Sequence, residues 1–179
     1  MATPPVFTTG AVLTATQMNA VGMWLVKTQS FTNDSPLITG VFSADYEHYV
    51  AVLRCTSSIT GQYTAVQLIN GTTPKTTNYT RAGLVSTTGG VLASDSPGTG
   101  QITWHVAGQS TTGIYTTMSF YRPFLTAETG FKTEGTYLGN YYASGGIQTE
   151  SYSATGFKIL ADGNAATYTG SVSVYGYND

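Results

Sequence analysis

The alternation of hydrophobic and polar residues changes character near residue 30. Downstream of that point, short runs place apolar side chains at every second position, and Gly, Pro, Asn or Asp residues separate the runs. A period of two is typical of β-strands that have one packed face and one solvated face. The pattern predicts an antiparallel β-sandwich of about eight to ten strands. The predicted strands lie at 37–42, 49–55, 61–70, 78–85, 101–108, 114–124, about 135–143, in one or two pieces over 147–160, and at 168–177, with a loop at 94–100.

The segment upstream of residue 30 has a different pattern. Residues 1–12 contain two prolines and a glycine and are expected to form an extended arm. In residues 13–29, apolar positions recur at spacings of three and four, as on one face of a helix. The sequence therefore predicts an N-terminal arm and short helix over 1–30 and a β-sandwich domain over 31–179.

No helix-length periodic segment lies between the predicted strands, so a sheet built from β-α-β units is not expected. Closely spaced strands with turn residues between them are typical of sandwiches and barrels. We therefore expect an all-β sandwich or barrel without an internal repeat.

The amino-acid composition and charge argue against several classes of function. Charged residues make up only 9% of the 179 residues, net charge is −2, and the chain holds 13 tyrosines and 21 glycines. Nucleic-acid binding needs clustered Lys and Arg, whereas the seven basic residues here are scattered, so no nucleic-acid partner is expected. The sequence has no apolar stretch long enough for a membrane helix, and its start lacks the basic and apolar regions of a secretory signal. We expect synthesis in a cytoplasm and no membrane insertion.

Motifs for catalysis or metal binding are missing from the sequence. Only His48 and His105 could act as an imidazole base, and His105 is predicted to be a surface or interface residue. No Gly-x-Ser-x-Gly elbow and no His-Glu-x-x-His motif occurs. The single cysteine, Cys55, lies in an apolar run and is expected to be a buried, inert thiol. These observations favour a protein that is not an enzyme and binds no cofactor or metal.

Tyrosines are dense between residues 137 and 152. Exposed tyrosines beside Ser, Asn and Gly form adaptable binding surfaces and can stack on sugar rings. The alternative is that they fill the sandwich core or a subunit interface. The candidate surface-binding residues are Tyr137, Tyr141, Tyr142 and Tyr152.

Both ends of the chain resemble the small structural proteins of tailed bacteriophages. At the start, an aromatic residue and a glycine precede Val-Leu-Thr-Ala and then Met-Asn; at the end, a strand closes in Val-Tyr-Gly-Tyr. The segment 42–53 also matches the usual first long strand of that family. The residues that carry the likeness are Phe7, Gly10, Val12, Leu13, Thr14, Ala15, Met18, Asn19 and Val174 to Tyr177.

The resemblance implies a virion protein with a jelly-roll-like β-sandwich head that forms a homo-oligomer, with a trimer favoured. It would be an appendage of the tail or capsid, such as a fibre or minor tail protein, with other virion proteins as partners and the host surface as a further contact. Two alternatives remain open: a capsid decoration or cement protein, and a receptor-recognition module that binds a surface glycan. The N-terminal segment would dock either on the particle or on its own sandwich. Its candidate anchoring residues are Phe7, Leu13, Met18, Val21 and Trp24.

Overall fold

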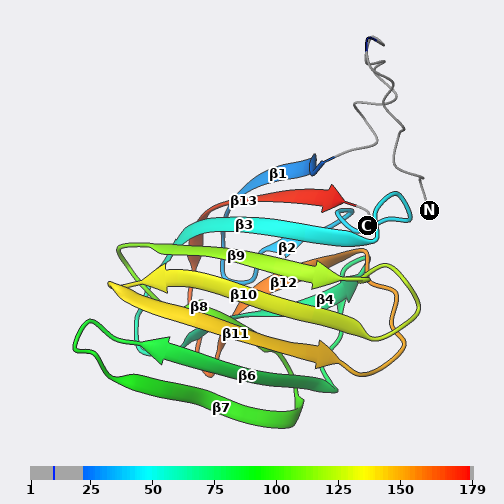
Figure 1. Ribbon diagram of the computed structural model, residues 1–179. Coiled ribbons are helices and arrows are strands. Elements are labelled where there is room, and N and C mark those ends of the chain that lie inside the picture. The colour runs from blue at the N-terminus through cyan, green and yellow to red at the C-terminus, as the bar shows by residue number, and fades with distance from the viewer. Residues whose placement is uncertain (1–9, 11–21, 178–179) are drawn as a thin grey trace.

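The computed structural model describes residue 10 and residues 22–177, and these residues form two antiparallel β-sheets (Figure 1). Short apolar and polar alternations separated by Gly-containing turns produce this all-β architecture. The strands are β1 Trp24–Asn33, β2 Leu37–Ile38, β3 His48–Ser57, β4 Tyr63–Asn70, β5 Thr73–Pro74, β6 Tyr79–Ser86, β7 Leu92–Gln101, β8 Trp104–Gly108, β9 Ile114–Tyr121, β10 Thr129–Tyr137, β11 Asn140–Gln148, β12 Gly156–Asp162 and β13 Tyr168–Tyr177.

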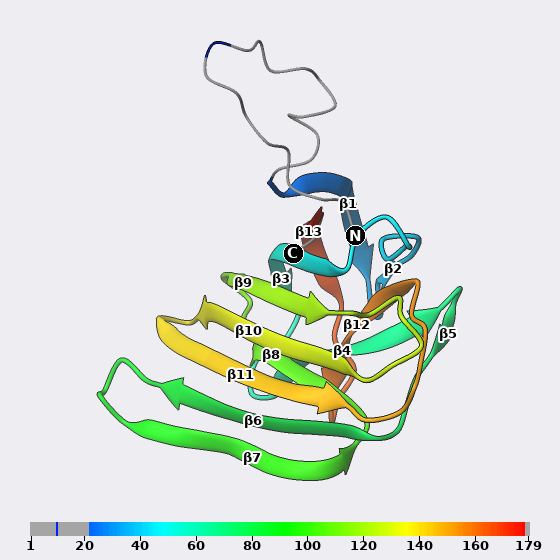
Figure 2. The same ribbon diagram turned by 45° about the vertical axis from the view of Figure 1, so that its right-hand side comes forward.

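The two sheets differ in size. The large sheet has eight strands in the order β1-β13-β3-β9-β10-β11-β6-β7. The small sheet has the order β2-β12-β4-β5, and β8 also pairs with β4. Figure 2 shows β2, β4, β5 and β12 on one side of the large sheet. One face of the large sheet is therefore covered by the small sheet, and we call the opposite face the outer face.

Alternation along the strands separates the core from the outer face. In β9, Met118 and Phe120 are fully buried, whereas Tyr115 and Tyr121 are exposed. Trp104 of β8 is central to the core: its ring stacks on Phe131 with 4.6 Å between centroids and meets Tyr79 edge-on at 4.8 Å. Its indole N–H donates to the Thr80 carbonyl at 3.0 Å. Further ring contacts continue the aromatic layer through Phe120, Phe157, Phe42 and Tyr49.

The predicted all-β sandwich is confirmed. The clearest alternations became long strands: 49–55 lies within β3 and 168–177 coincides with β13. These two strands pair in register from Tyr168 opposite Ser57 to Tyr177 opposite His48. The buried state expected for Cys55 is also confirmed, because its side chain is 4% exposed in the core.

The predicted helix over 13–29 is wrong for residues 24–29, which belong to β1. β1 pairs with β13, and its hydrogen bonds along that edge replace helical ones. The side chains of Lys27 and Gln29 donate to the carbonyls of Thr39 and Leu37, which ties β1 to the segment that holds β2. Apolar residues spaced by three and four are only a weak helical signal. At these positions the pairing with β13 decides the conformation instead. Residues 13–21 lie outside the described residues, and the predicted boundary at residue 30 falls inside β1.

Three strand predictions also need correction. The predicted loop at 94–100 is part of β7, and the predicted strand at 37–42 is regular only over Leu37–Ile38. The predicted single strand around 135–143 is the end of β10 and the start of β11, joined by a hairpin turn at Leu138 and Gly139. Leu138 and Gly139 have positive φ angles of 48° and 76°, as a tight two-residue hairpin turn requires. Leucine is unusual in that conformation, so the composition of the segment did not signal the turn.

Candidate functional site

Among the described residues, the outer face of the large sheet differs from the other surfaces in its exposed apolar side chains. Strand register places most of the exposed large apolar side chains on it. A protein that leaves a sheet face uncovered and apolar in places commonly uses it to bind a partner. These outward residues are Leu25, Val52, Leu84, Leu92, Tyr115, Tyr121, Tyr141 and Ile147.

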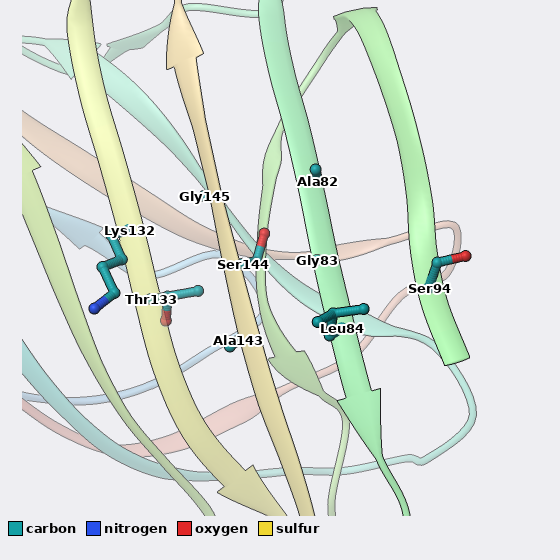
Figure 3. A pocket seen from close by; sticks show the side chains of 9 residues that line it. All are labelled: Ala82, Gly83, Leu84, Ser94, Lys132, Thr133, Ala143, Ser144 and Gly145. Atoms are coloured by element: carbon teal, nitrogen blue, oxygen red, sulfur yellow. The ribbon is translucent and has the colours of Figure 1, made fainter. Parts of the chain in front are cut away.

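A groove of about 560 Å³ lies on this face over β10, β11 and β6 (Figure 3). It arises because small residues meet across neighbouring strands: Ala82 is opposite Gly145, and Ala143 is opposite Leu84. Lys132 of β10 and Leu84 of β6 stand at its two sides. Because Ala82, Ala143 and Gly145 carry no large side chain, an apolar channel remains that has room for a bulky group.

A row of side chains crosses the same face beside the groove. Arg54 of β3 lies opposite Tyr115 of β9. Thr136 of β10 lies between Tyr115 and Tyr141 of β11, opposite each of them. The guanidinium carbon of Arg54 lies 5.7 Å from the centre of the Tyr115 ring, within cation–π range. Two exposed phenol rings therefore flank a threonine hydroxyl, with a cation at one end.

A second hollow lies where this row meets the end of the sandwich. It lies between the loop before β9, with Thr112 and Gly113, and the turn at Leu138 and Gly139. A Cβ atom on Gly113 would lie 2.6 Å from a carbon of the Tyr115 ring. Glycine at that position therefore lets the ring lie against its own strand.

Charge on the described part of the outer face is low. Lys132 and Glu134 form an ion pair at 2.6 Å, and both side chains are about half exposed. The hydrogen bond to Glu134 raises the pKa of Lys132. Because this pair is neutral overall, Arg54 supplies most of the charge of the row beside the groove.

A polar cluster is buried at the other side of the large sheet. Asp162 of β12 accepts from His105 of β8, and its carboxylate lies 3.5 Å from the guanidinium of Arg81 of β6. The ring of Tyr63 stacks on His105 with 4.2 Å between centroids. His105 is 2% exposed, so the predicted surface or interface position is wrong. The cluster joins β6 of the large sheet to both β8 and β12, which indicates a structural role.

The four tyrosines predicted as a surface cluster do not lie together. Tyr142 is fully buried, so its assignment to a binding surface is corrected. It occupies the inward position next to Tyr141, because neighbouring residues of a strand point to opposite faces. Tyr141 is 46% exposed on the outer face. Tyr137 packs partly against the core, close to Gly108. Tyr152 lies in the β11–β12 connection with Lys75 5.8 Å from its ring centre.

The predicted anchoring residues fall largely outside the described chain. Phe7, Leu13, Met18 and Val21 are not among the described residues. Trp24 begins β1, where it lies half-buried opposite Gly176. Its position shows that the segment next to the arm is built into the edge of the large sheet.

Sequence reasoning missed Tyr115, Leu84 and the small residues of the groove. Tyr115 and Leu84 both sit at outward positions of alternating strands, so a search for large apolar residues on the wet face of each strand would have found them. The groove depends on pairing between Ala82 and Gly145, which no local pattern contains.

The described residues also bear on two other features, metal-ion sites and membrane-spanning helices. Within residues 22–177, no group of three or more His, Cys, Asp or Glu side chains is placed to hold a metal ion. The same part of the chain contains no helix long and apolar enough to cross a membrane.

Comparisons with known proteins return no match. No protein-family model matches the sequence, no curated protein matches it significantly, and no solved structure matches the fold significantly. Function must therefore be argued from the residues and from the geometry of the outer face.

Proposed function

We propose that this protein is a structural component of a bacteriophage virion, a homo-oligomeric appendage of the tail or capsid without enzymatic activity. Its sandwich would be displayed on the particle, and its N-terminal segment would attach it. The sequence motifs at both ends support the proposal, since they resemble those of small structural proteins of tailed phages. The low charge and the high content of Tyr and Gly suit a module that works in an assembly.

The observation that carries the proposal most strongly is the outer face, which none of the described residues covers. A large sheet normally needs cover only on the side that forms the core, and its other face is then polar. Here that face displays Leu84 and Leu92 at 56% and 72% exposure beside an apolar groove. A surface of this kind indicates a protein that functions in contact with other subunits.

The proposal is tested with purified phage particles. Quantitative mass spectrometry should find the chain in virions that have been banded by density, at a fixed ratio to the major capsid protein. The ratio should match a rotational symmetry of the particle, because appendages follow the symmetry of the site that carries them. Absence of the chain from banded particles, together with its presence in the soluble lysate, would refute the proposal.

Recognition of a host-surface glycan is a second candidate function, favoured by the row of Tyr115, Thr136 and Tyr141. Phenol rings offer an apolar face to the C–H groups of a sugar and a hydroxyl for hydrogen bonding. Replacement of both tyrosines by alanine should then abolish binding to host cells or their isolated polysaccharide. Tyr121→Ala is the control, since Tyr121 is exposed on the same face but lies at the other end of β9. Equal binding by all variants would exclude this function.

A further inference from the structure

We infer that the groove region of the outer face is the contact surface for a second copy of this chain. The groove region comprises the outward side chains of β6, β7, β10 and β11 around the groove. Its main members are Ala82, Leu84, Leu92, Lys132, Ala143, Gly145 and Ile147. This inference deepens the proposed function, on which it rests, by naming the partner and the surface of an oligomeric appendage.

Shape complementarity is the first argument. An isologous contact, in which two identical chains meet through the same surface, needs a projection and a recess that both belong to that surface. The recess is the groove, whose floor is formed by Ala82, Ala143 and Gly145. The projections are Leu84 at its side and Leu92, which lies opposite Ser86 on the neighbouring strand. A leucine of one copy can therefore enter the groove of the next copy.

The area available is the second argument. Eight strands spaced by about 4.8 Å, with about nine residues each at about 3.3 Å per residue, give a face of roughly 1,000 Å². A stable, specific interface buries about 800 Å² on each partner. The four strands of the groove region supply about half of this face, so the contact is centred on the groove region and extends over the neighbouring strands of the outer face to reach that size.

Electrostatics is the third argument. Burial of an unpaired charge at an interface is costly, and repulsion between like charges grows when two identical surfaces meet. In the groove region Lys132 already pairs with Glu134, so a second copy meets a locally neutral surface. The same neutrality disfavours a phosphate-rich partner, which would need a cluster of basic residues.

The test compares two matched lysine substitutions by sedimentation velocity over a wide range of protein concentration. Leu84 and Ile102 are almost equally exposed, at 56% and 53%, but only Leu84 borders the groove. The wild-type chain should sediment as a dimer, because a contact through the same surface on both copies closes at two copies. Leu84→Lys should fall to the mass of one chain, 18.9 kDa, whereas Ile102→Lys should assemble like the wild type.

A second variant protects the test against a folding defect. Ser94→Arg changes an exposed residue that also lines the groove, and it should weaken assembly while circular dichroism stays unchanged. A wild-type chain that stays monomeric at every concentration would overturn the inference. So would assembly of both groove variants at wild-type strength. Failure here concerns the purified chain in solution, whereas absence from virions would refute the proposed function, so the two failures are distinguishable.

Discussion

The two faces of the large sheet are built from the same strands and differ almost completely in what they contact. On the inner face, Phe131 stacks on Trp104 of β8, which packs against this face, within a continuous layer of aromatic rings. On the outer face, Leu84 and Leu92 are more than half exposed beside a groove floored by alanine and glycine. The inner face is filled by the chain's own side chains, whereas no described residue covers the apolar groups of the outer face, which we propose contact a second copy.

Large apolar residues on the two faces have different roles, although amino-acid composition does not distinguish them. A large apolar side chain on the inner face stabilises the fold, because its removal leaves a cavity. The same type of side chain on the outer face contributes little to the stability of one chain. Its effect should appear only when a partner is present. Substitutions on the two faces should therefore affect different measurements.

The largest expected effect is on the inner face. Trp104→Ala removes a fully buried ring that contacts Tyr79 and Phe131, and it should lower the free energy of unfolding by about 3–5 kcal/mol. Urea denaturation followed by circular dichroism measures this change. Leu25→Ala, at a position 59% exposed on the outer face and outside the groove region, is the control and should shift stability by no more than about 0.5 kcal/mol. A similar loss in both variants would contradict the distinction between the faces.

The next effect compares a buried ionic cluster with an exposed ion pair. Asp162→Asn removes the negative charge that faces Arg81 and His105, and the Arg81 side chain is only 8% exposed. Because Asp162 keeps some contact with solvent, the expected loss is about 2–3 kcal/mol, below that of a fully buried pair. Glu134→Gln breaks the outer-face pair with Lys132, where both partners are solvated, and should cost less than about 0.5 kcal/mol. Equal denaturation midpoints for the two variants would show that the cluster has no structural role.

A smaller effect depends on pH. Burial raises the pKa of the Cys55 thiol to about 12, whereas an unfolded thiol has a pKa of about 8.5. Between these values the folded state holds a proton that the unfolded state has released, so stability falls as the pH rises. Cys55 alone should account for a loss of about 2 kcal/mol between roughly pH 8 and pH 10. Burial also raises the pKa of Tyr79 and Tyr168, which extends the loss to higher pH.

The measurement for this effect is urea denaturation at both pH values for the wild type and for Cys55→Ala. The variant should lose less stability on going to alkaline pH, whatever its stability at neutral pH. An identical pH dependence in the two proteins would show that the thiol is not held protonated by burial.

The strands could be predicted from the sequence wherever alternation was strong. The run 168–177 could be predicted from its own residues, since Tyr168, Val172 and Val174 all point to the buried side and Thr169, Ser171 and Ser173 to the other. Residues 24–29 were harder, because their strand state depends on pairing with β13, which is distant in the sequence. The turn at Leu138 was missed for the opposite reason: its backbone adopts a conformation that leucine rarely takes.

The candidate site could be predicted only in part. Tyr141 was identified as an exposed aromatic residue, and the neighbouring Tyr142 was assigned to the same surface although it is buried. Side-chain direction within a strand depends on register, and the wrong strand boundaries around residue 138 concealed that register. The groove could not be predicted, because its floor joins β6 and β11 through a pairing that only the fold reveals.

Thiol labelling tests most directly whether the outer face, and no other surface, is covered by a partner. Leu84→Cys and Ile102→Cys, each in a Cys55→Ala background, place one exposed thiol inside and outside the groove region. The account predicts that maleimide labelling at position 84 slows as protein concentration rises, while labelling at position 102 keeps a constant rate. Constant rates at both positions, or equal slowing at both, would contradict it.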